Sequence, residues 1–201
     1  ARIPGLDKAQ KKRLKNGTLF GIELVDSVTR LCAMNLLLHG IGSESGDNVT
    51  ALNELPVVTK DALAGKHGEY DIVLANPPFN VDEVSLSGVE KDRRFNTYGI
   101  PRNKTAAKKA DAGKETVPNG NYLWINLFAT SLKPQGRAAL VMANSASDAR
   151  ASEQEFRQKL IESRTVDVMV AVGPNMFYTV TLPCTLWFLD RGKFGTDRED
   201  T

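Results

Sequence analysis

The chain has 201 residues, of which 41% are hydrophobic and 25% charged, a balance typical of one folded domain or a large part of one. No apolar run approaches the roughly 20 residues of a membrane-spanning helix, and the polar, basic start does not resemble a signal peptide. The net charge of +2 by itself gives no indication of a nucleic-acid partner. The two cysteines, Cys32 and Cys184, do not have the spacing of metal ligands. These features predict a cytoplasmic protein with reduced thiols and no bound metal.

The first predicted elements are a strand over residues 18–24 and a helix directly after it. Asp26 or Ser27 is placed to cap the start of this helix, and His39-Gly40 ends it in the usual way, with glycine at the stop. Its apolar side chains fall on one face, which we expect to be buried: Val28, Leu31, Cys32 and Leu36.

Two further strands are predicted in the middle of the chain. Residues 55–59 form a short candidate, and residues 70–75 form a stronger one, because most of them are continuously apolar, as a strand covered on both faces requires. The second strand must stop at the two prolines that follow, because proline cannot continue a ladder. Residues 80–120 are polar and basic with little periodicity, which predicts a long loop.

Regular structure returns after this loop. Ile125, Phe128, Ala129 and Leu132 have the spacing of one helical face. The elements expected after that helix are a turn at 133–136, a strand at 137–142, a helix from a Ser152–Glu155 capping box to about Glu162, and strands at 166–172 and 182–189. Alternating strands and helices predict an α/β layered sheet, in which ligands bind beyond the carboxyl ends of the strands.

The segment Asn76-Pro77-Pro78-Phe79 follows the strand at 70–75, where such a site is expected. An exocyclic amino group is a poor nucleophile, because its lone pair is delocalised into the ring. The Asn76 side-chain oxygen and the Pro77 carbonyl can accept hydrogen bonds from its two N–H groups and free that lone pair, and the prolines hold both acceptors in place. Phe79 offers a flat face on which an extruded base can stack. In isolation, a plain Pro-Pro stop after a buried strand is an equally good interpretation.

The tetrapeptide resembles the catalytic motif of S-adenosylmethionine-dependent amino-group methyltransferases, and phenylalanine in its last position is typical of the methylation subunits of type I restriction–modification systems. The resemblance extends over nearly the whole chain, through Gly21-Ile22-Glu23, residues 30–41, 119–124, 131–144 and 177–189. It implies a Rossmann-like sheet, mostly parallel with an antiparallel C-terminal hairpin. It also implies transfer of a methyl group to adenine N6 in double-stranded DNA, with specificity and restriction subunits as partners.

The same resemblance assigns a cofactor site. Glu23 corresponds to the acid that accepts the ribose hydroxyls, Asp61 and Ala62 lie at the adenine end, and Asn76 borders the site. Without that context, Glu23 reads as a surface residue beside a helix and Asp61 as a turn residue. No glycine-rich turn of the family precedes the strand at 18–24. We therefore expect residues 1–201 to be a single, partial catalytic domain that lacks its first, central strand, binds the cofactor weakly or not at all, and is inactive in isolation.

Positive charge is concentrated in the predicted loop at 81–120: residues 91–114 carry eight basic and two acidic side chains. By resemblance this loop approaches the target DNA, and Tyr98 or Tyr122 can supply contacts near an extruded base. From charge alone, a solvated loop is the more common explanation. The candidate phosphate contacts are Arg93, Arg94, Arg102, Lys104, Lys108 and Lys109.

Two alternatives to DNA adenine methylation stay open. A different amino-group methyltransferase, acting on RNA adenine, cytosine N4 or a protein glutamine, uses the same motif. A non-catalytic fragment that binds DNA or a specificity subunit is the second alternative. Cys184 follows a proline, as the nucleophile of C5-cytosine methyltransferases does, but it opens an apolar strand and is better explained as a core thiol.

Overall fold

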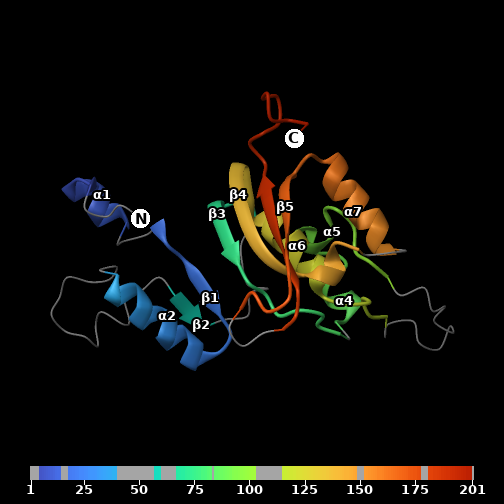
Figure 1. Cartoon of the computed structure of the whole chain (residues 1–201), viewed down its shortest axis with the longest axis horizontal. Coiled ribbons are helices and arrows are strands. Elements are labelled where there is room, and N and C mark those ends of the chain that lie inside the picture. The colour runs from blue at the N-terminus through green and yellow to red at the C-terminus, as the bar shows by residue number, and fades with distance from the viewer. Residues whose placement is uncertain are drawn as a thin grey trace. The chain divides into compact units, whose positions relative to one another are not determined.

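The computed structural model of the protein describes residues 5–14, 18–39, 57–59, 67–82, 84–102, 115–148, 152–177 and 181–200 (Figure 1). The chain divides into two compact units, the N-terminal unit (residues 1–65) and the C-terminal unit (residues 66–201). Each is described by itself. Among the described residues, no helix has both the length and the apolar character needed to cross a membrane.

The N-terminal unit contains a short parallel sheet. Strand β1 (Gly21–Glu23) pairs with β2 (Val57–Thr59), which places Glu23 opposite Thr59. The strands predicted over residues 18–24 and 55–59 are therefore confirmed, each with three paired residues. Helix α1 (Lys8–Arg13) precedes them and begins with a capping box formed by Asp7 and Gln10.

Helix α2 (Asp26–Leu38) follows β1, as predicted, and His39 ends it. The prediction that Asp26 or Ser27 caps its start is wrong, because the cap position is Val25, which offers no side-chain hydrogen bond. Asp26 is instead the first helical residue, where its charge suits the positive end of the helix dipole. The predicted buried face is also largely wrong, because a helix over a two-stranded sheet has room to bury only a narrow stripe at Ala33. The exposed side chains of α2 are Val28, Leu31, Cys32, Met34 and Leu38.

The C-terminal unit is built on a four-stranded mixed sheet in the order β3-β4-β6-β5 (Figure 1). Strand β3 (Tyr70–Ala75) runs parallel to β4 (Leu132–Ala143). Strand β6 (Cys184–Asp190) is antiparallel to both of its neighbours, β4 and β5 (Val166–Val172). The predicted α/β class is confirmed, with parallel pairing in the earlier strands and an antiparallel C-terminal hairpin. Strand β3 forms an edge of this sheet.

The turn predicted at residues 133–136 lies inside β4 as an irregularity of its pairing with β3. The paired residues jump from Tyr70–Leu132 to Ile72–Arg137, so the intervening residues of β4 bulge out of the ladder. Gly136 permits this close passage, because an added Cβ would lie 2.7 Å from the Tyr70 carbonyl oxygen.

One face of the sheet carries the hydrophobic core. Helix α6 (Asn121–Ser131) and helix α7 (Ser152–Glu162) contribute to this core, which includes Ile125, Leu140 and the fully buried Trp187. The opposite face is open: Leu74 is 77% exposed there. An apolar hollow on that face is lined by Leu74, Ala139, Val141, Leu186 and Phe188.

The described part of residues 81–120 is a folded insertion rather than the predicted extended loop. It contains helices α4 (Leu86–Val89) and α5 (Arg93–Asn96). Its two ends are joined by backbone hydrogen bonds, from Leu86 N to Glu115 O (2.9 Å) and from Val117 N to Val84 O (3.0 Å). The sequence pattern hid this structure, because the buried side chains are few and irregularly spaced: Leu86, Val89, Phe95, Pro101 and Val117.

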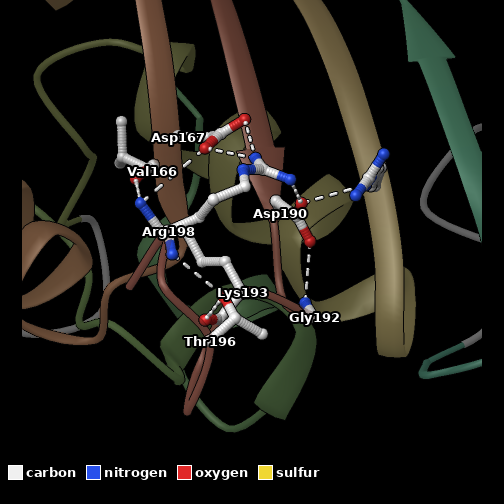
Figure 2. A network of polar contacts seen from close by, with 8 residues as sticks. Val166, Asp167, Asp190, Gly192, Lys193, Thr196 and Arg198 are labelled. Carbon is white, nitrogen blue, oxygen red and sulfur yellow. Dashed lines mark hydrogen bonds and ion pairs between the residues drawn. The ribbon is translucent and has the colours of Figure 1, made fainter. Parts of the chain in front are cut away.

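The residues after β6 are held by charged contacts at the amino end of β4 (Figure 2). Buried Asp190 lies 2.9 Å from the Arg137 Nε atom and 3.4 Å from an Arg198 guanidinium nitrogen, and its carboxylate accepts a hydrogen bond from Gly192 N (2.8 Å). Arg198 also donates to both carboxylate oxygens of Asp167, each at 2.9 Å. The residues after β6 are therefore fastened to the sheet.

Candidate active site

The Asn76-Pro77-Pro78-Phe79 segment begins directly after β3, at the carboxyl end of the parallel β3–β4 pair. Pro77 is buried as a residue, while Asn76 is exposed. In the described part of the chain, no residue accepts from or donates to the Asn76 side chain. The motif chemistry requires an amide oxygen that accepts hydrogen bonds at this strand end, and Asn76 carries one there.

The residue after the motif is fixed by a pair of asparagines. Asn80 has a left-handed backbone (φ +50°), and its N–H donates to the Asn121 Oδ1 atom at 2.9 Å. The Asn121 Nδ2 atom donates back to the Asn80 Oδ1 atom at 2.8 Å, and Ser145 Oγ donates to the same oxygen at 3.1 Å. The three residues belong to the motif turn, the start of α6 and the short helix η5 (Asn144–Ala146) after β4.

The predicted cofactor residues are described only in part. Glu23 is the last residue of β1 in the N-terminal unit, and its Oε1 atom accepts a hydrogen bond from Val25 N at 2.9 Å. This bond orients the carboxylate and leaves its second oxygen for another donor. Asn76 belongs to the C-terminal unit. Asp61 and Ala62 lie outside the described residues.

The predicted phosphate contacts differ in how they are engaged. The Arg94 guanidinium forms a two-pronged pair with Asp92, with its Nη2 atom 2.6 Å from the Asp92 Oδ2 atom, and it lies over the Phe95 ring. The hydrogen bond from Arg94 lowers the pKa of the Asp92 carboxyl. Arg102 forms ion pairs with Glu90 and Glu115.

Arg93 is the exposed arginine of α5, so it is the candidate best placed to meet phosphate among those that the structure describes. Lys104, Lys108 and Lys109 lie outside the described residues. Their roles stay predictions.

The prediction that Tyr98 or Tyr122 meets an extruded base is wrong for Tyr122, which is fully buried, and stays a prediction for Tyr98. The Tyr122 ring is fully buried against Phe156, and its hydroxyl donates to the Ala146 carbonyl at 2.5 Å. Burial raises the pKa of the Tyr122 phenol. Tyr98 packs edge-on against Phe156, with its hydroxyl 3.3 Å from the Thr165 hydroxyl. Tyr122 is a core residue, and Tyr98 is a partly buried residue packed against the core. The prediction of Cys184 as a core thiol is confirmed by its burial.

Sequence reasoning missed the polar residues that brace the motif: Asn80, Asn119, Asn121, Ser145 and Glu153. The dense run Asn119-Gly120-Asn121 at the start of a helix is a signal that could have suggested them. Within the described residues, no group of three or more His, Cys, Asp or Glu side chains is arranged to hold a metal ion. The arrangement places an exposed amide at a strand end, followed by a turn that hydrogen-bonded amides hold.

Comparison with known proteins defines the class of this chain. A family model described as N-6 DNA Methylase matches residues 6–200, and the chain belongs to this family. It is 39% identical over 126 residues to the methylase subunit of the type I restriction enzyme MjaIX of Methanocaldococcus jannaschii, a match that covers 62% of this chain and 21% of that subunit. It is 28% identical over 187 residues to the HindI methylase subunit of Haemophilus influenzae, covering 92% of this chain and 37% of that subunit.

Solved structures agree on the fold. The methyltransferase subunit of a type I restriction–modification system from Streptococcus thermophilus superimposes with a TM-score of 0.65 at 23% identity, over 85% of this chain and 33% of that one. The M protein of the type I restriction enzyme EcoKI gives a TM-score of 0.61 at 21% identity, over 92% of this chain and 33% of that protein. The chain thus spans about a third or less of the length of most of these relatives.

Proposed function

We propose that the protein transfers a methyl group from S-adenosylmethionine to adenine N6 in DNA, as part of the modification subunit of a type I restriction–modification system. The observation that carries this proposal is the placement of Asn76-Pro77-Pro78-Phe79 at the carboxyl end of β3, with an exposed amide and two prolines. The match of residues 6–200 to the N-6 DNA Methylase family supports it.

The Asn76 oxygen and the Pro77 carbonyl accept hydrogen bonds from the two N–H groups of the adenine amino group. This draws the nitrogen toward tetrahedral geometry and localises its lone pair for attack. The prolines keep both acceptors in position before the base arrives, and the partly exposed Phe79 offers a ring on which the base can stack. The nitrogen gains the methyl group with its own lone pair, and the pair of the broken methyl–sulfur bond stays on sulfur. The methylated nitrogen is then positively charged and loses one proton to solvent, because the two acceptors are too weakly basic to take it.

The residues that the structure describes are compatible with a nucleoside cofactor. The Glu23 carboxylate stands at the carboxyl end of a parallel strand, with one oxygen held by Val25 N and the other free to accept from a ribose hydroxyl. S-adenosylmethionine, when bound, supplies an electrophilic methyl group. Asp61 and Ala62 are proposed to lie at its adenine end.

DNA, specificity and restriction subunits are the proposed partners, because the relatives are methylase subunits of type I restriction enzymes. The proposed location of the protein and these partners is the cytoplasm, where cellular DNA is modified. Arg93 and the lysines at 104, 108 and 109 are the proposed phosphate contacts, with Arg94 and Arg102 available only if their carboxylate partners release them.

The test is transfer of a tritium-labelled methyl group by the full encoded protein, offered DNA, RNA and protein substrates in parallel. Label in N6-methyladenine of DNA is the expected result. Asn76→Ala should abolish transfer while the dissociation constant for S-adenosylmethionine changes by less than about threefold. Asn96→Ala, an exposed asparagine in α5, is the matched control and should transfer normally. Label in RNA, cytosine N4 or glutamine instead would assign the protein to another substrate class.

A further inference from the structure

The turn that follows the motif is anchored more firmly than its exposed position suggests. Asn80 and Asn121 exchange two hydrogen bonds of 2.9 and 2.8 Å, which close a ring between the motif turn and helix α6. The next residue is tied as well, since Gly120 N donates to the Val81 carbonyl at 2.7 Å. A Cβ on Gly120 would lie only 3.3 Å from the Val81 Cβ, so the two backbones run in close contact.

Helix α6 is a rigid support for this anchor. Asn121 is 1% exposed, and most of the helix is buried between the sheet and the insertion. The Asn121 N–H donates to the Asn119 Oδ1 atom at 3.0 Å, and the Asn119 Nδ2 atom donates to Glu153 of α7 at 2.7 Å. The motif turn is thereby connected through two asparagines to a second helix.

The geometry of the motif depends on both of its ends. The pairing of Ala75 with Leu140 fixes the start, and the asparagine pair fixes the end at Asn80. Four residues lie between, and two of them are prolines with fixed φ. Asn80 itself adopts a left-handed backbone, which asparagine tolerates better than most residues. The directions of the Pro77 carbonyl and of the Phe79 ring are therefore set by a short segment held at both ends.

We infer that Asn80 and Asn121 are positioning residues for methyl transfer, with Ser145 as a third support. This inference rests on the proposed function. Their side chains touch neither base nor cofactor; they hold the acceptors and the stacking ring where the amino group must enter. A displacement of about 1 Å at such a site lowers the rate by up to about a hundredfold.

Hydrogen exchange tests the anchor without reference to activity. In Asn121→Ala, the Asn80 amide loses its acceptor and should exchange at least about tenfold faster, while the amides of the β4–β6 ladder keep their protection. Asn80→Gly retains the left-handed backbone and the N–H but removes the acceptor oxygen, so it reports on the side chain alone. Unchanged exchange at residues 79–81 in both variants would overturn the inference.

Methyl transfer by the full encoded protein tests the consequence. Asn80→Gly and Asn121→Ala should lower kcat about 10- to 100-fold, with the dissociation constant for S-adenosylmethionine within about threefold of wild type. Asn80→Asp keeps the acceptor for Asn121 and Ser145 and should restore most of the rate. Asn175→Gly is the matched control, because Asn175 is an exposed, left-handed asparagine (φ +61°) in the turn after β5.

The outcomes separate the inference from the proposed function. Wild-type kcat in both the Asn80→Gly and Asn121→Ala proteins would overturn the positioning roles and leave the methyltransferase proposal intact. An equal loss in Asn80→Asp and Asn80→Gly would also overturn them, because the hydrogen bonds to the side-chain oxygen of residue 80 survive only in the first. If the wild-type protein transfers no methyl group, the proposed function fails, and hydrogen exchange still decides whether the pair holds the turn.

Discussion

Replacing Asn126 with alanine should lower the free energy of unfolding of the C-terminal unit by about 2–5 kcal/mol. Asn126 is fully buried in α6, and its amide donates to the carbonyl oxygens of Phe95 (2.6 Å) and Gly99 (2.8 Å). Its Oδ1 atom accepts a longer hydrogen bond from Tyr98 N (3.4 Å). This one side chain therefore fastens the insertion to the helix beneath it.

The magnitude follows from what alanine leaves behind. Each buried carbonyl without a partner costs about 1–3 kcal/mol, and the two carbonyls of Phe95 and Gly99 lose their Asn126 donor together. The truncated side chain also opens a small space, into which the insertion can relax. For a domain of this size, about 3 °C of melting temperature is lost per kcal/mol, so Tm should fall by about 6–15 °C.

Urea and thermal unfolding followed by circular dichroism measure this loss. Asn96→Ala is the control, because Asn96 is an exposed asparagine of α5 with a single side-chain hydrogen bond, to the Glu90 carbonyl at 2.9 Å. It should change the unfolding free energy by less than about 0.5 kcal/mol. A loss below about 1 kcal/mol for Asn126→Ala, or equal losses in the two variants, would refute the reasoning.

Three further predictions concern charged groups, each checked by thermal unfolding. Asp92→Asn should lower Tm at neutral pH, because the charged Asp92 stabilises the folded protein through its pair with Arg94. Since Arg94 lowers the pKa of Asp92, this stabilisation is present above the ordinary value of 3.8 and is lost as the pH falls through the lowered pKa. Glu153→Gln should raise Tm at neutral pH, because burial raises the pKa of Glu153 and the charged carboxylate therefore destabilises the folded state. The gain in Tm should vanish below pH 4.5, the ordinary pKa of glutamate, where Glu153 is protonated in both states. Arg198→Ala should lower Tm more than Arg30→Ala, since Arg198 bridges two carboxylates whereas Arg30 makes an exposed pair within α2, and equal shifts would contradict this.

The sequence predicts the parts of the fold that local patterns determine. The apolar run at residues 70–75 gives β3 with its correct ends, but the expected cover on both faces is missing from the C-terminal unit, which leaves Ile72 and Leu74 exposed. The helix predicted from Ser152 to about Glu162 is present with these bounds. The predicted helical face is partly correct: Ile125 and Ala129 are buried in α6, whereas Phe128 is partly buried and Leu132 is the first residue of β4. Nearly all of this helix is buried. Its outer side is covered by the insertion, whose few apolar residues carry no periodic signal.

The candidate site likewise has one part that the sequence predicts and one part that it does not. The motif is readable because its four residues are adjacent and their chemistry is local. The pair of Asn80 and Asn121 is not readable, because 41 residues separate the two side chains and only the fold brings them together. The burial of Tyr122 is not readable either, because its ring packs against Phe156, whose position no local pattern reveals.

The strand order β3-β4-β6-β5 has a consequence for biosynthesis. Strand β5 meets the rest of the sheet through β6, which is the last described strand to be translated. While Val166–Val172 leaves the ribosome, its hydrogen-bonding partner has not yet been made, and the nascent sheet cannot close. A premature stop codon before Cys184 would therefore remove a central strand, and Trp187 with it, rather than trim an edge. Correct folding of this unit should begin only after translation of residues 184–190 is complete.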